Sequence, residues 1–484
     1  MDPFTVMNEL RISAPLFEKL QLHLFPGDGD EHGAVICAGM SETDRGLRLF
    51  AREIVLARDG VDYVPGQYGY RALTPEFVAR VSNHCARQGL CYFAVHCHGG
   101  DDFVRFSDVD LESHQRGYPA LLDITDGGPI GALVFAHNAV AGEIWRPRKV
   151  SKLTKLTVIG VNHRRLYPEP VQPTRGFADV YHRQSLLFGA VGQEELRKAK
   201  IGIIGLGGVG SLINEWLARL GVGAIVAVDF DRIEPSNRSR VVDSLRSDCR
   251  DWLLESKIPL LQGVGRRLAR YKVHIAERVA RRANPNIDFF PIVGNVVDEK
   301  VAKSLRDIDY LFLCADTMQS RLVFNALVHQ YLIPGVQIGA KVTSDVDIGD
   351  VTDVFSVARL VLPYQTGGCL LCNQLIDSAK LQEEALSPEE RRQQRYVNDP
   401  GVHAPSVITL NALGSAQAAN DFMMGYLGLF DTQEAKIGYR MHDALSRTWR
   451  SADCADTMNC LHCGTSDRSI LARGDRASLP CRNV

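Results

Sequence analysis

Four of the cysteines are arranged as two Cys-x-x-Cys pairs, which is the spacing of zinc knuckles. Cys369 and Cys372 form one pair, and Cys460 and Cys463 form the other, far along the chain. Two knuckles can supply four thiolates to one tetrahedral Zn²⁺ ion, which predicts a closed, structural metal site. A redox pair and ordinary buried cysteines are the alternative interpretations.

A second group of candidate metal ligands lies near the N-terminus. His96-Cys-His98 follows an apolar run, and residues i and i+2 at the end of a strand face the same side, so the two imidazoles should converge. Asp110, in Ser107-x-x-Asp110, can supply a carboxylate as third ligand. Such a set leaves one position of a zinc ion open for water, and Glu31 can serve as the base. The alternatives are a helix start capped by Ser107 and a histidine pair without metal.

A third pattern, Gly205-Leu-Gly207-Gly-Val-Gly210, joins an apolar run to a helical pattern. Glycines at these positions let the backbone turn tightly and approach phosphates, while the following helix offers free N–H groups to an anion. Asp229 ends the next apolar run, about 20 residues on, where an acidic residue can hold ribose hydroxyls. The pattern predicts a nucleotide site; the alternative is that the glycines only pack a helix on a strand.

Composition excludes several classes of protein. The chain has 484 residues, 45% of them hydrophobic and 23% charged, which predicts two or three folded domains. Its 55 Lys and Arg nearly balance 57 Asp and Glu, which argues against a nucleic-acid partner. No apolar run reaches the roughly 18 residues of a membrane span, and no signal peptide is evident, so we expect a cytoplasmic protein without a membrane partner. Twelve cysteines are too dilute for a disulfide scaffold.

The elements that must position these residues fall into two differently built halves. Residues 1–150 mix apolar runs with helical patterns at 45–57 and 75–87, which predicts an α+β domain. Residues 151–178 are proline-rich and are expected to be a linker, although 156–161 can form one more strand.

The second half is more regular. Residues 179–470 begin with a βαβ pattern, namely strand 201–204, helix 211–219 and strand 224–228, and continue with helix 272–282 and strands 289–292 and 310–314. This pattern predicts an α/β domain with a doubly wound, Rossmann-like parallel sheet. Residues 471–484 are expected to be a C-terminal tail.

The segment from Asp229 to Arg240, DFDRIEPSNRSR, is not the usual continuation of a dehydrogenase. Together with GLGGVGS and LARLGVG it resembles the ThiF/MoeB and ubiquitin-activating-enzyme superfamily, over roughly residues 181 to 464. The resemblance implies that ATP adenylates the C-terminal glycine of a ubiquitin-fold protein. Attack of a carboxylate on the α-phosphate builds negative charge that Mg²⁺, Arg and Lys can neutralise.

The resemblance also implies individual roles. Asp229 resembles the ribose-binding aspartate, and Asn237 and Arg240 resemble residues that contact the phosphates. Lys272 resembles the phosphate-binding lysine and Asp316 the magnesium-binding aspartate. The implied ATP and Mg²⁺ site comprises Gly205, Gly207, Gly210, Asp229, Asp231, Asn237, Arg240, Lys272 and Asp316. Arg183 resembles an arginine that a partner subunit lends across the interface, which implies a homodimer. Between Arg240 and Lys272 the chain is longer than the resemblance leads us to expect, and this insertion, 243–271, can bind a partner or cover the site.

The ordered set Glu31, His96-x-His98 and Ser107-x-x-Asp110 resembles the JAB/JAMM metalloprotease domain, which cleaves isopeptide or peptide bonds after ubiquitin-fold proteins. The resemblance implies a catalytic zinc held by the histidines and the aspartate, with Glu31 as general base and Ser107 at the oxyanion. The spacing from His98 to Ser107 is one residue longer than the usual pattern. Cysteine pairs similar to those of this chain occur in the activating-enzyme superfamily, which favours zinc at the tetrad.

These patterns predict an enzyme that adenylates a ubiquitin-like protein and hydrolyses bonds made to its C-terminus, with a conjugating-enzyme-like protein as a possible further partner. One alternative is activation of a sulfur-carrier protein for cofactor biosynthesis, with an N-terminal domain that only binds; a plain dehydrogenase is the weakest alternative. No thioester nucleophile is evident in the sequence. Cys454, Cys481 and Cys249 are candidates, and an oxyester or release of the acyl-adenylate is equally open.

Overall fold

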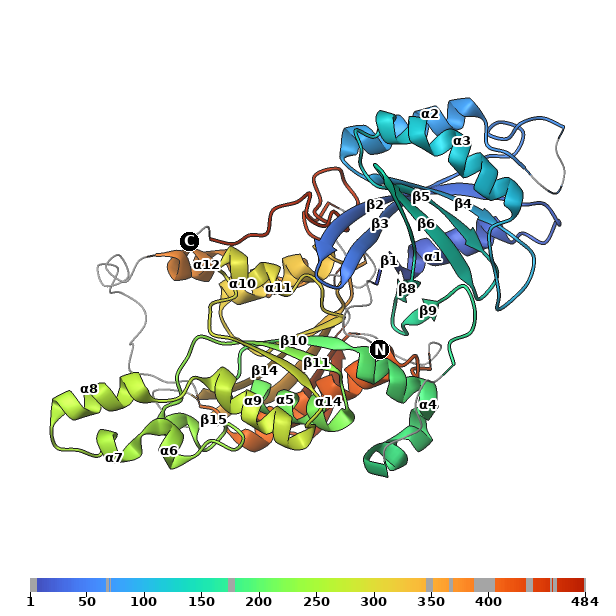
Figure 1. Cartoon of the computed structure of the whole chain (residues 1–484). Helices are drawn as coiled ribbons and strands as arrows, with labels where there is room; N and C mark the ends of the chain where they lie inside the picture. Colours follow the sequence, from blue (N-terminus) through green and yellow to red (C-terminus); the bar gives the residue numbers. More distant parts are fainter. Residues whose placement is uncertain are drawn as a thin grey trace. The chain divides into compact units, whose positions relative to one another are not determined.

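The computed structural model describes residues 7–66, 69, 71–172, 179–344, 351–364, 369–386, 405–431, 438–452, 455 and 459–482 (Figure 1). The chain divides into two compact units. The first comprises Met1–Gln172, His329–Leu332 and Ser466–Ser478, and the second comprises Pro173–Val328, Ile333–Thr465 and Leu479–Val484. Among the described residues, no helix is both long and apolar enough to cross a membrane.

The first unit is built on a nine-stranded mixed sheet in the order β7-β6-β5-β4-β2-β3-β1-β8-β9. Its elements are β1 (Glu9–Ser13), α1 (Ala14–Leu24), β2 (Gly33–Thr43), β3 (Gly46–Leu56), α2 (Pro75–Gln88), β4 (Cys91–Cys97), α3 (Asp108–Ile124), β5 (Ile130–Phe135), β6 (Val140–Arg146), β7 (Lys149–Lys152), β8 (Lys155–Ile159) and β9 (Arg164–Leu166). Because β8 and β9 pair into the sheet, residues 155–166 belong to this unit, where the sequence suggested a linker.

Helices cover both faces of this sheet (Figure 1). Phe17 and Leu20 of α1 pack into one core cluster, and Phe77 of α2 and Tyr118 of α3 pack into the other. The C-terminal segment 466–478 also packs on this unit. A Cβ on Gly39 would lie 2.2 Å from the carbonyl oxygen of Ala472, so only glycine permits this close approach.

The helix expected at residues 45–57 is wrong, because this segment forms the strand β3. β3 lies between β2 and β1 in the sheet, and Thr43 pairs with Gly46 at the tight turn that leads into it. Leu47, Leu49 and Ala51 alternate along β3 and all enter the same core cluster. This period of two was the sequence signal for a strand, and the ladders on both sides of β3 override any helical preference.

The second unit contains an eight-stranded sheet in the order β12-β11-β10-β13-β14-β15-β16-β17. Its helices are η1 (Asp179–Tyr181), α4 (His182–Lys198), α5 (Gly208–Leu220), η2 (Pro235–Asn237), α6 (Arg246–Cys249), α7 (Asp251–Leu254), α8 (Pro259–Leu268), α9 (Lys272–Ala283), α10 (Glu299–Lys303), α11 (Met318–Gln330), α12 (Ser378–Ala385) and α14 (Ile408–Tyr426). Its strands are β10 (Lys200–Ile204), β11 (Ala224–Val228), β12 (Asp288–Ile292), β13 (Tyr310–Leu313), β14 (Gly335–Ser344), β15 (Val351–Val361), β16 (Tyr439–Asp443) and β17 (Thr448–Ala452).

The predicted doubly wound α/β fold is confirmed in this unit. β12, β11, β10, β13 and β14 pair in parallel, and β15 to β17 continue the sheet in antiparallel fashion. Helices α5, α9 and α14 lie on one face, and α10 and α11 lie on the other (Figure 1). In parallel sheets of this kind ligands bind outside the carboxyl ends of the strands, which is where the predicted nucleotide residues stand.

The insertion 243–271 forms three short helices, α6 to α8. Arg278 of α9 fixes it through hydrogen bonds of 2.8 and 3.0 Å to Asp248 and of 3.1 Å to Asp243. Its surface includes exposed apolar side chains, among them Trp252 and Leu260, which are 68% and 76% exposed.

Candidate functional site

The glycine-rich loop follows β10 and leads into α5. Gly205 has φ +89°, and a Cβ there would lie 2.9 Å from the backbone nitrogen of Ala315. A Cβ on Gly210 would lie 1.9 Å from the carbonyl oxygen of Gly205, so the turn closes only with glycine at this position. Gly207 is the N-cap of α5, and a Cβ on it would meet open space. The loop therefore leaves the first turn of α5 accessible to an anion.

Asp229 stands directly after β11 and holds the loop in place. One of its carboxylate oxygens, Oδ2, accepts a 2.7 Å hydrogen bond from Leu206 N–H, and the other, Oδ1, accepts one of 2.8 Å from Asp231 N–H. Burial raises the pKa of this carboxyl, and Lys272 acts in the opposite direction. A carboxylate offers about four acceptor sites, so roughly two remain for a ligand.

Two basic residues lie near this loop. The ammonium of Lys272, the first residue of α9, lies 2.7 Å from a carboxylate oxygen of Asp231. Arg240 packs beside the loop, because a Cβ on Gly208 would lie 3.2 Å from its side chain. Asn237, three residues before Arg240 in the chain, is buried at the end of η2. The structure therefore gathers Lys272 and Arg240 around the glycine-rich loop.

Asp316 and Arg183 have different surroundings. Asp316 is exposed and follows Ala315, whose backbone packs against Gly205, so it lies close to the loop. Arg183 is exposed near the start of α4.

Sequence reasoning overlooked Gly208 and Asn411 in this site. A Cβ on Gly208 would lie 2.3 Å from the amide nitrogen of Asn411, which is 3% exposed in α14. The adjacent glycines at 207 and 208 were the available signal for this close approach, whereas nothing in the sequence marked Asn411, because it is far along the chain.

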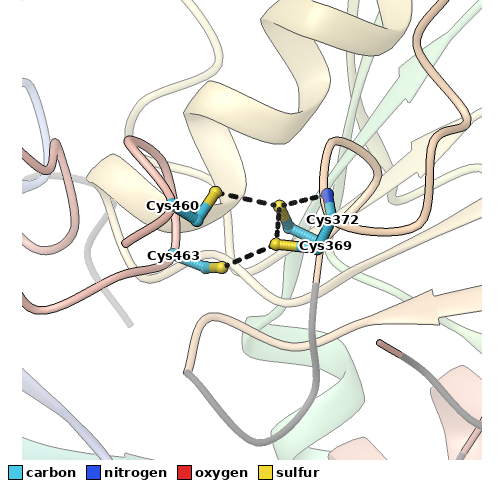
Figure 2. Close-up of side chains that lie close together, drawn as sticks. All are labelled: Cys369, Cys372, Cys460 and Cys463. Atoms are coloured by element: carbon cyan, nitrogen blue, oxygen red, sulfur yellow. Dashed lines mark hydrogen bonds between the residues drawn. The ribbon is translucent and has the colours of Figure 1, made fainter. Parts of the chain in front are cut away.

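The four cysteines of the two knuckles converge (Figure 2). Sulfur–sulfur distances are 3.5 Å for Cys369–Cys372, 3.6 Å for Cys369–Cys460 and 3.5 Å for Cys372–Cys463. Four sulfurs at about 2.3 Å from a zinc ion would be separated by about 3.8 Å in a tetrahedron. Contacts with Cys369 and Cys463 lower the pKa of Cys460. The donor set and its size therefore fit a structural zinc ion.

Asn325, a residue that the sequence did not indicate, ties both knuckles to α11. Its side-chain oxygen accepts a 2.9 Å hydrogen bond from Leu370 N–H, and its amide nitrogen lies 2.9 Å from Nδ1 of His462. Asn325 is fully buried. α11 begins two residues after Asp316. Asn325 therefore links the cysteine tetrad to the helix that follows the end of β13.

The three candidate ligands of the first unit also converge. The Nε2 atoms of His96 and His98 are 3.2 Å apart, and each lies 3.5 Å from a carboxylate oxygen of Asp110. Glu31 approaches from the other side, 3.7 Å from His98 Nε2. Pairing of β2 with β4 causes this convergence, because it places Gly33, two residues after Glu31, opposite His96.

These distances are compatible with a bound metal ion as well as with direct contacts between the side chains. Ligands at about 2.0–2.1 Å from zinc are separated by about 3.4 Å in a tetrahedron. Although burial acts in the other direction, His96 and His98 hold the pKa of Asp110 well below its usual range. Burial raises the pKa of Glu31. The cluster thus places a carboxylate of lowered pKa, Asp110, beside one of raised pKa, Glu31.

Ser107 plays the structural role that the alternative interpretation described. It caps α3, and it forms a capping box with Asp110, whose Oδ2 accepts hydrogen bonds from Ser107 N–H at 2.8 Å and Ser107 Oγ at 2.7 Å. The capping box fixes the rotamer of Asp110 toward the histidines, so cap and candidate metal ligand are compatible. A hydrogen bond from Ser107 to an oxyanion would require its hydroxyl to turn away from Asp110.

Two of the three candidate thioester cysteines are described. Cys249 is fully buried within an apolar cluster, and burial raises its pKa to about 11. Burial also raises the pKa of Cys481 to about 11. Neither thiol is poised as a thiolate near neutral pH. Cys454 lies outside the described residues.

The doubly wound sheet and the glycine-rich loop that Asp229 holds in place define the second unit as a Rossmann-like α/β domain. Residues 181–462 match the model of the ThiF family, and the chain belongs to that family.

Three relatives resemble part of the chain. Molybdopterin-synthase adenylyltransferase of Escherichia coli (strain K12) is 28% identical over 287 residues, covering 59% of this chain and 95% of that protein. Sulfur carrier protein ThiS adenylyltransferase of Bacillus subtilis (strain 168) is 31% identical over 147 residues, covering 30% and 39%. Ubiquitin-like modifier-activating enzyme 5 of Gallus gallus is 22% identical over 260 residues, covering 51% and 55%.

Proposed function

We propose that the second unit uses ATP and Mg²⁺ to adenylate the C-terminal carboxylate of a ubiquitin-like protein. The observation that carries this proposal is the fixing of the glycine-rich loop by Asp229, within the fold of the ThiF family. Asp229 would accept the ribose hydroxyls, and Arg240 and Lys272 would neutralise the phosphates as the carboxylate attacks. Lys272 would exchange its pairing with Asp231 for the phosphate.

Asp316 would hold the magnesium ion, and Arg183 would serve the site of a second subunit. Exposed apolar residues close to Arg183, namely Leu186 and Leu187 before the break in α4 at Gly189, support a homodimer, because exposed apolar surface is stabilised when it is covered.

Pyrophosphate exchange tests the adenylation proposal. The protein, ATP, Mg²⁺ and a panel of candidate ubiquitin-like proteins should give exchange with a cognate member, and Asp316→Ala should abolish it. Failure of the whole panel to support exchange would contradict the proposal.

A sulfur-carrier protein is the second candidate substrate for this unit. The raised pKa values of Cys249 and Cys481, about 11 for each thiol, favour a reaction that stops at the acyl-adenylate. The names of the relatives from Escherichia coli and Bacillus subtilis point the same way. Trapping separates the candidates: an ester or thioester on this chain favours conjugation, with a conjugating-enzyme-like partner, whereas an acyl-adenylate alone favours sulfur transfer.

For the first unit we propose zinc-dependent hydrolysis of the bond that follows the C-terminus of the ubiquitin-like protein, in the manner of JAB/JAMM metalloproteases. The carrying observation is the convergence of His96, His98 and Asp110, with Glu31 beside them. Zinc bound there would polarise a carbonyl and lower the pKa of a water molecule. Glu31 would accept the proton of the attacking water and pass it to the leaving amine.

A binding-only first unit is the alternative, and zinc content distinguishes the two. About two zinc ions per chain are expected if both sites are filled, and about one if only the tetrad binds metal. Glu31→Ala should stop cleavage and keep the zinc. Equal cleavage by Glu31→Ala and the parent would overturn the assignment of Glu31.

A further inference from the structure

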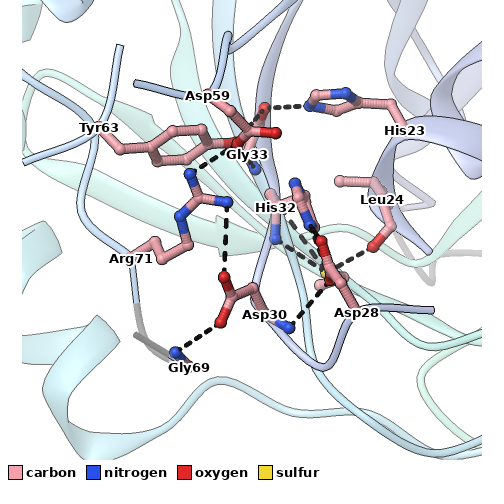
Figure 3. Close-up of polar contacts among 11 residues, drawn as sticks. His23, Leu24, Asp28, Asp30, His32, Gly33, Asp59, Tyr63, Gly69 and Arg71 are labelled. Carbon is pink, nitrogen blue, oxygen red and sulfur yellow. Dashed lines mark hydrogen bonds and ion pairs between the residues drawn. The ribbon is translucent and has the colours of Figure 1, made fainter. Parts of the chain in front are cut away.

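The backbone that carries Glu31 is tied to the loop between β3 and α2 by two reciprocal hydrogen bonds (Figure 3). Glu31 N–H donates to the carbonyl oxygen of Gly69 at 2.8 Å. In return, Gly69 N–H donates to Asp30 Oδ1 at 2.9 Å. The backbone at position 31 therefore depends on Gly69, which lies far along the chain.

Arg71 secures the loop side of this connection. Its guanidinium stacks 3.7 Å from the ring centroid of Tyr63, lies 2.6 Å from an Asp59 oxygen and lies 4.0 Å from an Asp30 oxygen. The Arg71 side chain is only 10% exposed. Figure 3 shows it between the loop and the segment that carries Asp30. A partly buried, stacked arginine holds its geometry better than a surface ion pair does.

The residues after Glu31 are fixed as well. His32 N–H donates to Cys97 Sγ at 3.3 Å, and Cys97 is the residue between the two candidate histidine ligands. Gly33 N–H donates to the hydroxyl of Tyr63 at 2.8 Å. The N–H groups of three successive residues thus each have a partner, which leaves the Glu31 side chain as the part of this segment that faces His98.

We propose that Arg71 and Asp30 are positioning residues that set the Glu31 carboxylate against the histidine–aspartate cluster. This inference rests on the proposed hydrolytic function of the first unit. Among the contacts that the structure describes, neither side chain ligates or hydrogen-bonds to the cluster; Asp30 acts through Gly69 and the adjoining Glu31 backbone, and Arg71 acts through Asp30. Because misplacing a catalytic group by about 1 Å costs roughly 100-fold in rate, releasing this connection should slow cleavage without removing metal.

The chain offers matched variants. Arg71→Met removes the charge and keeps much of the volume, whereas Arg71→Lys keeps the charge. Asp30→Asn retains an acceptor for Gly69 N–H. Arg80→Met is the control, because Arg80 has the same kinds of contact, 5.1 Å over Phe77 and 3.7 Å from Asp62, on α2.

The full-length zinc protein is assayed with a fluorogenic peptide that has a C-terminal glycine joined to aminomethylcoumarin. Arg71→Met should lower kcat roughly 10- to 100-fold with KM and zinc content near parent values. Arg71→Lys and Asp30→Asn should retain more activity than Arg71→Met, and Arg80→Met should match the parent. If Arg71→Met matches the parent, or if Arg80→Met loses as much activity, the inference is overturned.

Replacing zinc by cobalt gives a second measurement, the visible spectrum, which would not change if Arg71 only stabilised the fold. Visible spectra of the Co²⁺ forms of the parent, Glu31→Gln and Arg71→Met report the surroundings of the metal. Arg71→Met should shift toward Glu31→Gln at unchanged cobalt stoichiometry; a parent-like spectrum overturns the inference. If the parent binds metal in the first unit but does not cleave the probe or any candidate ubiquitin-like fusion, the hydrolase proposal fails, while the spectra still decide the positioning of Glu31.

Discussion

Substitution of Asp229 by asparagine is the sharpest test of the nucleotide site. Each carboxylate oxygen of Asp229 already accepts one backbone N–H, from Leu206 at 2.7 Å and from Asp231 at 2.8 Å. About one acceptor site is then left on each oxygen, enough for one ribose hydroxyl apiece. The amide nitrogen of asparagine cannot accept, so Asp229→Asn loses one backbone bond and one ribose bond together.

The magnitude follows from this count. A hydrogen bond to a charged group contributes about 1.5–3 kcal/mol, and the second ribose bond weakens when the negative charge is removed. We therefore expect ATP binding to lose about 2–4 kcal/mol, which is roughly 30- to 700-fold in Kd. Part of this loss would come from the glycine-rich loop, because Leu206 or Asp231 would lose its acceptor.

Calorimetry with ATP and with 2′- and 3′-deoxy-ATP measures the loss and assigns it. The parent should prefer ATP over both deoxy analogues, and Asp229→Asn should lose most of that preference, because one ribose bond is gone and the other is weakened. Asp288→Asn is the control, because the exposed Asp288 begins β12 opposite Ala224, at the other end of the sheet. If Asp229→Asn binds ATP within about threefold of the parent, the ribose assignment is refuted.

Three further predictions concern stability and metal binding. Glu9→Gln should lower the free energy of unfolding near pH 7 by about 3–5 kcal/mol, because it leaves Arg48 and Lys155, 2.6 and 3.3 Å from the carboxylate, without their counter-charge. Although burial opposes them, Lys155 and Arg48 hold the pKa of Glu9 well below its usual range, so the carboxylate stabilises the fold above its unfolded pKa. The difference from the parent should therefore shrink as the pH falls below about 4; urea titrations near pH 7 and near pH 3.5 would show it, and a pH-independent difference would contradict it. Cys463→Ala should remove about one zinc ion per chain and lower the thermal midpoint, as metal analysis and calorimetry can check. His98→Ala should remove about one zinc ion per chain, from the first unit instead of the tetrad, and leave pyrophosphate exchange unchanged. Loss of exchange would contradict the assignment of the two activities to separate sites.

Local patterns in the second unit were sufficient to predict its main elements. The strand expected at 224–228 coincides with β11, and the helix expected at 272–282 differs from α9 by one residue. Buried parallel strands are short continuous apolar runs, and the glycine-rich turn between β10 and α5 has a steric requirement that few sequences meet. The first unit was harder, because the apolar pattern of residues 45–57 fits a helix and a strand alike, and only pairing with β1 and β2 decides between them.

For the candidate site residues too, the local sequence suggested the residue types, but not which distant residues come together. The types and spacing of Cys369, Cys372, His96 and His98 suggested ligand sets from the sequence alone, because donor chemistry and the strand or knuckle that presents it are local properties. Their convergence with distant residues was not local. Nothing in the residue pattern indicated that Asn325 would join both knuckles.

The sequence by itself therefore determined the chemistry that this protein can attempt: phosphate approach at the glycine-rich loop, and two sets of metal-binding donors. Tertiary structure decided how those groups are held. Gly69 reaches Glu31, and Arg71 reaches the neighbouring Asp30, because the loop after β3 folds back on the start of β2. Asp229 fixes Leu206 because β10 and β11 lie side by side. Contacts of this kind join residues far apart in the chain, and no spacing rule specifies them, since they depend on how whole elements pack.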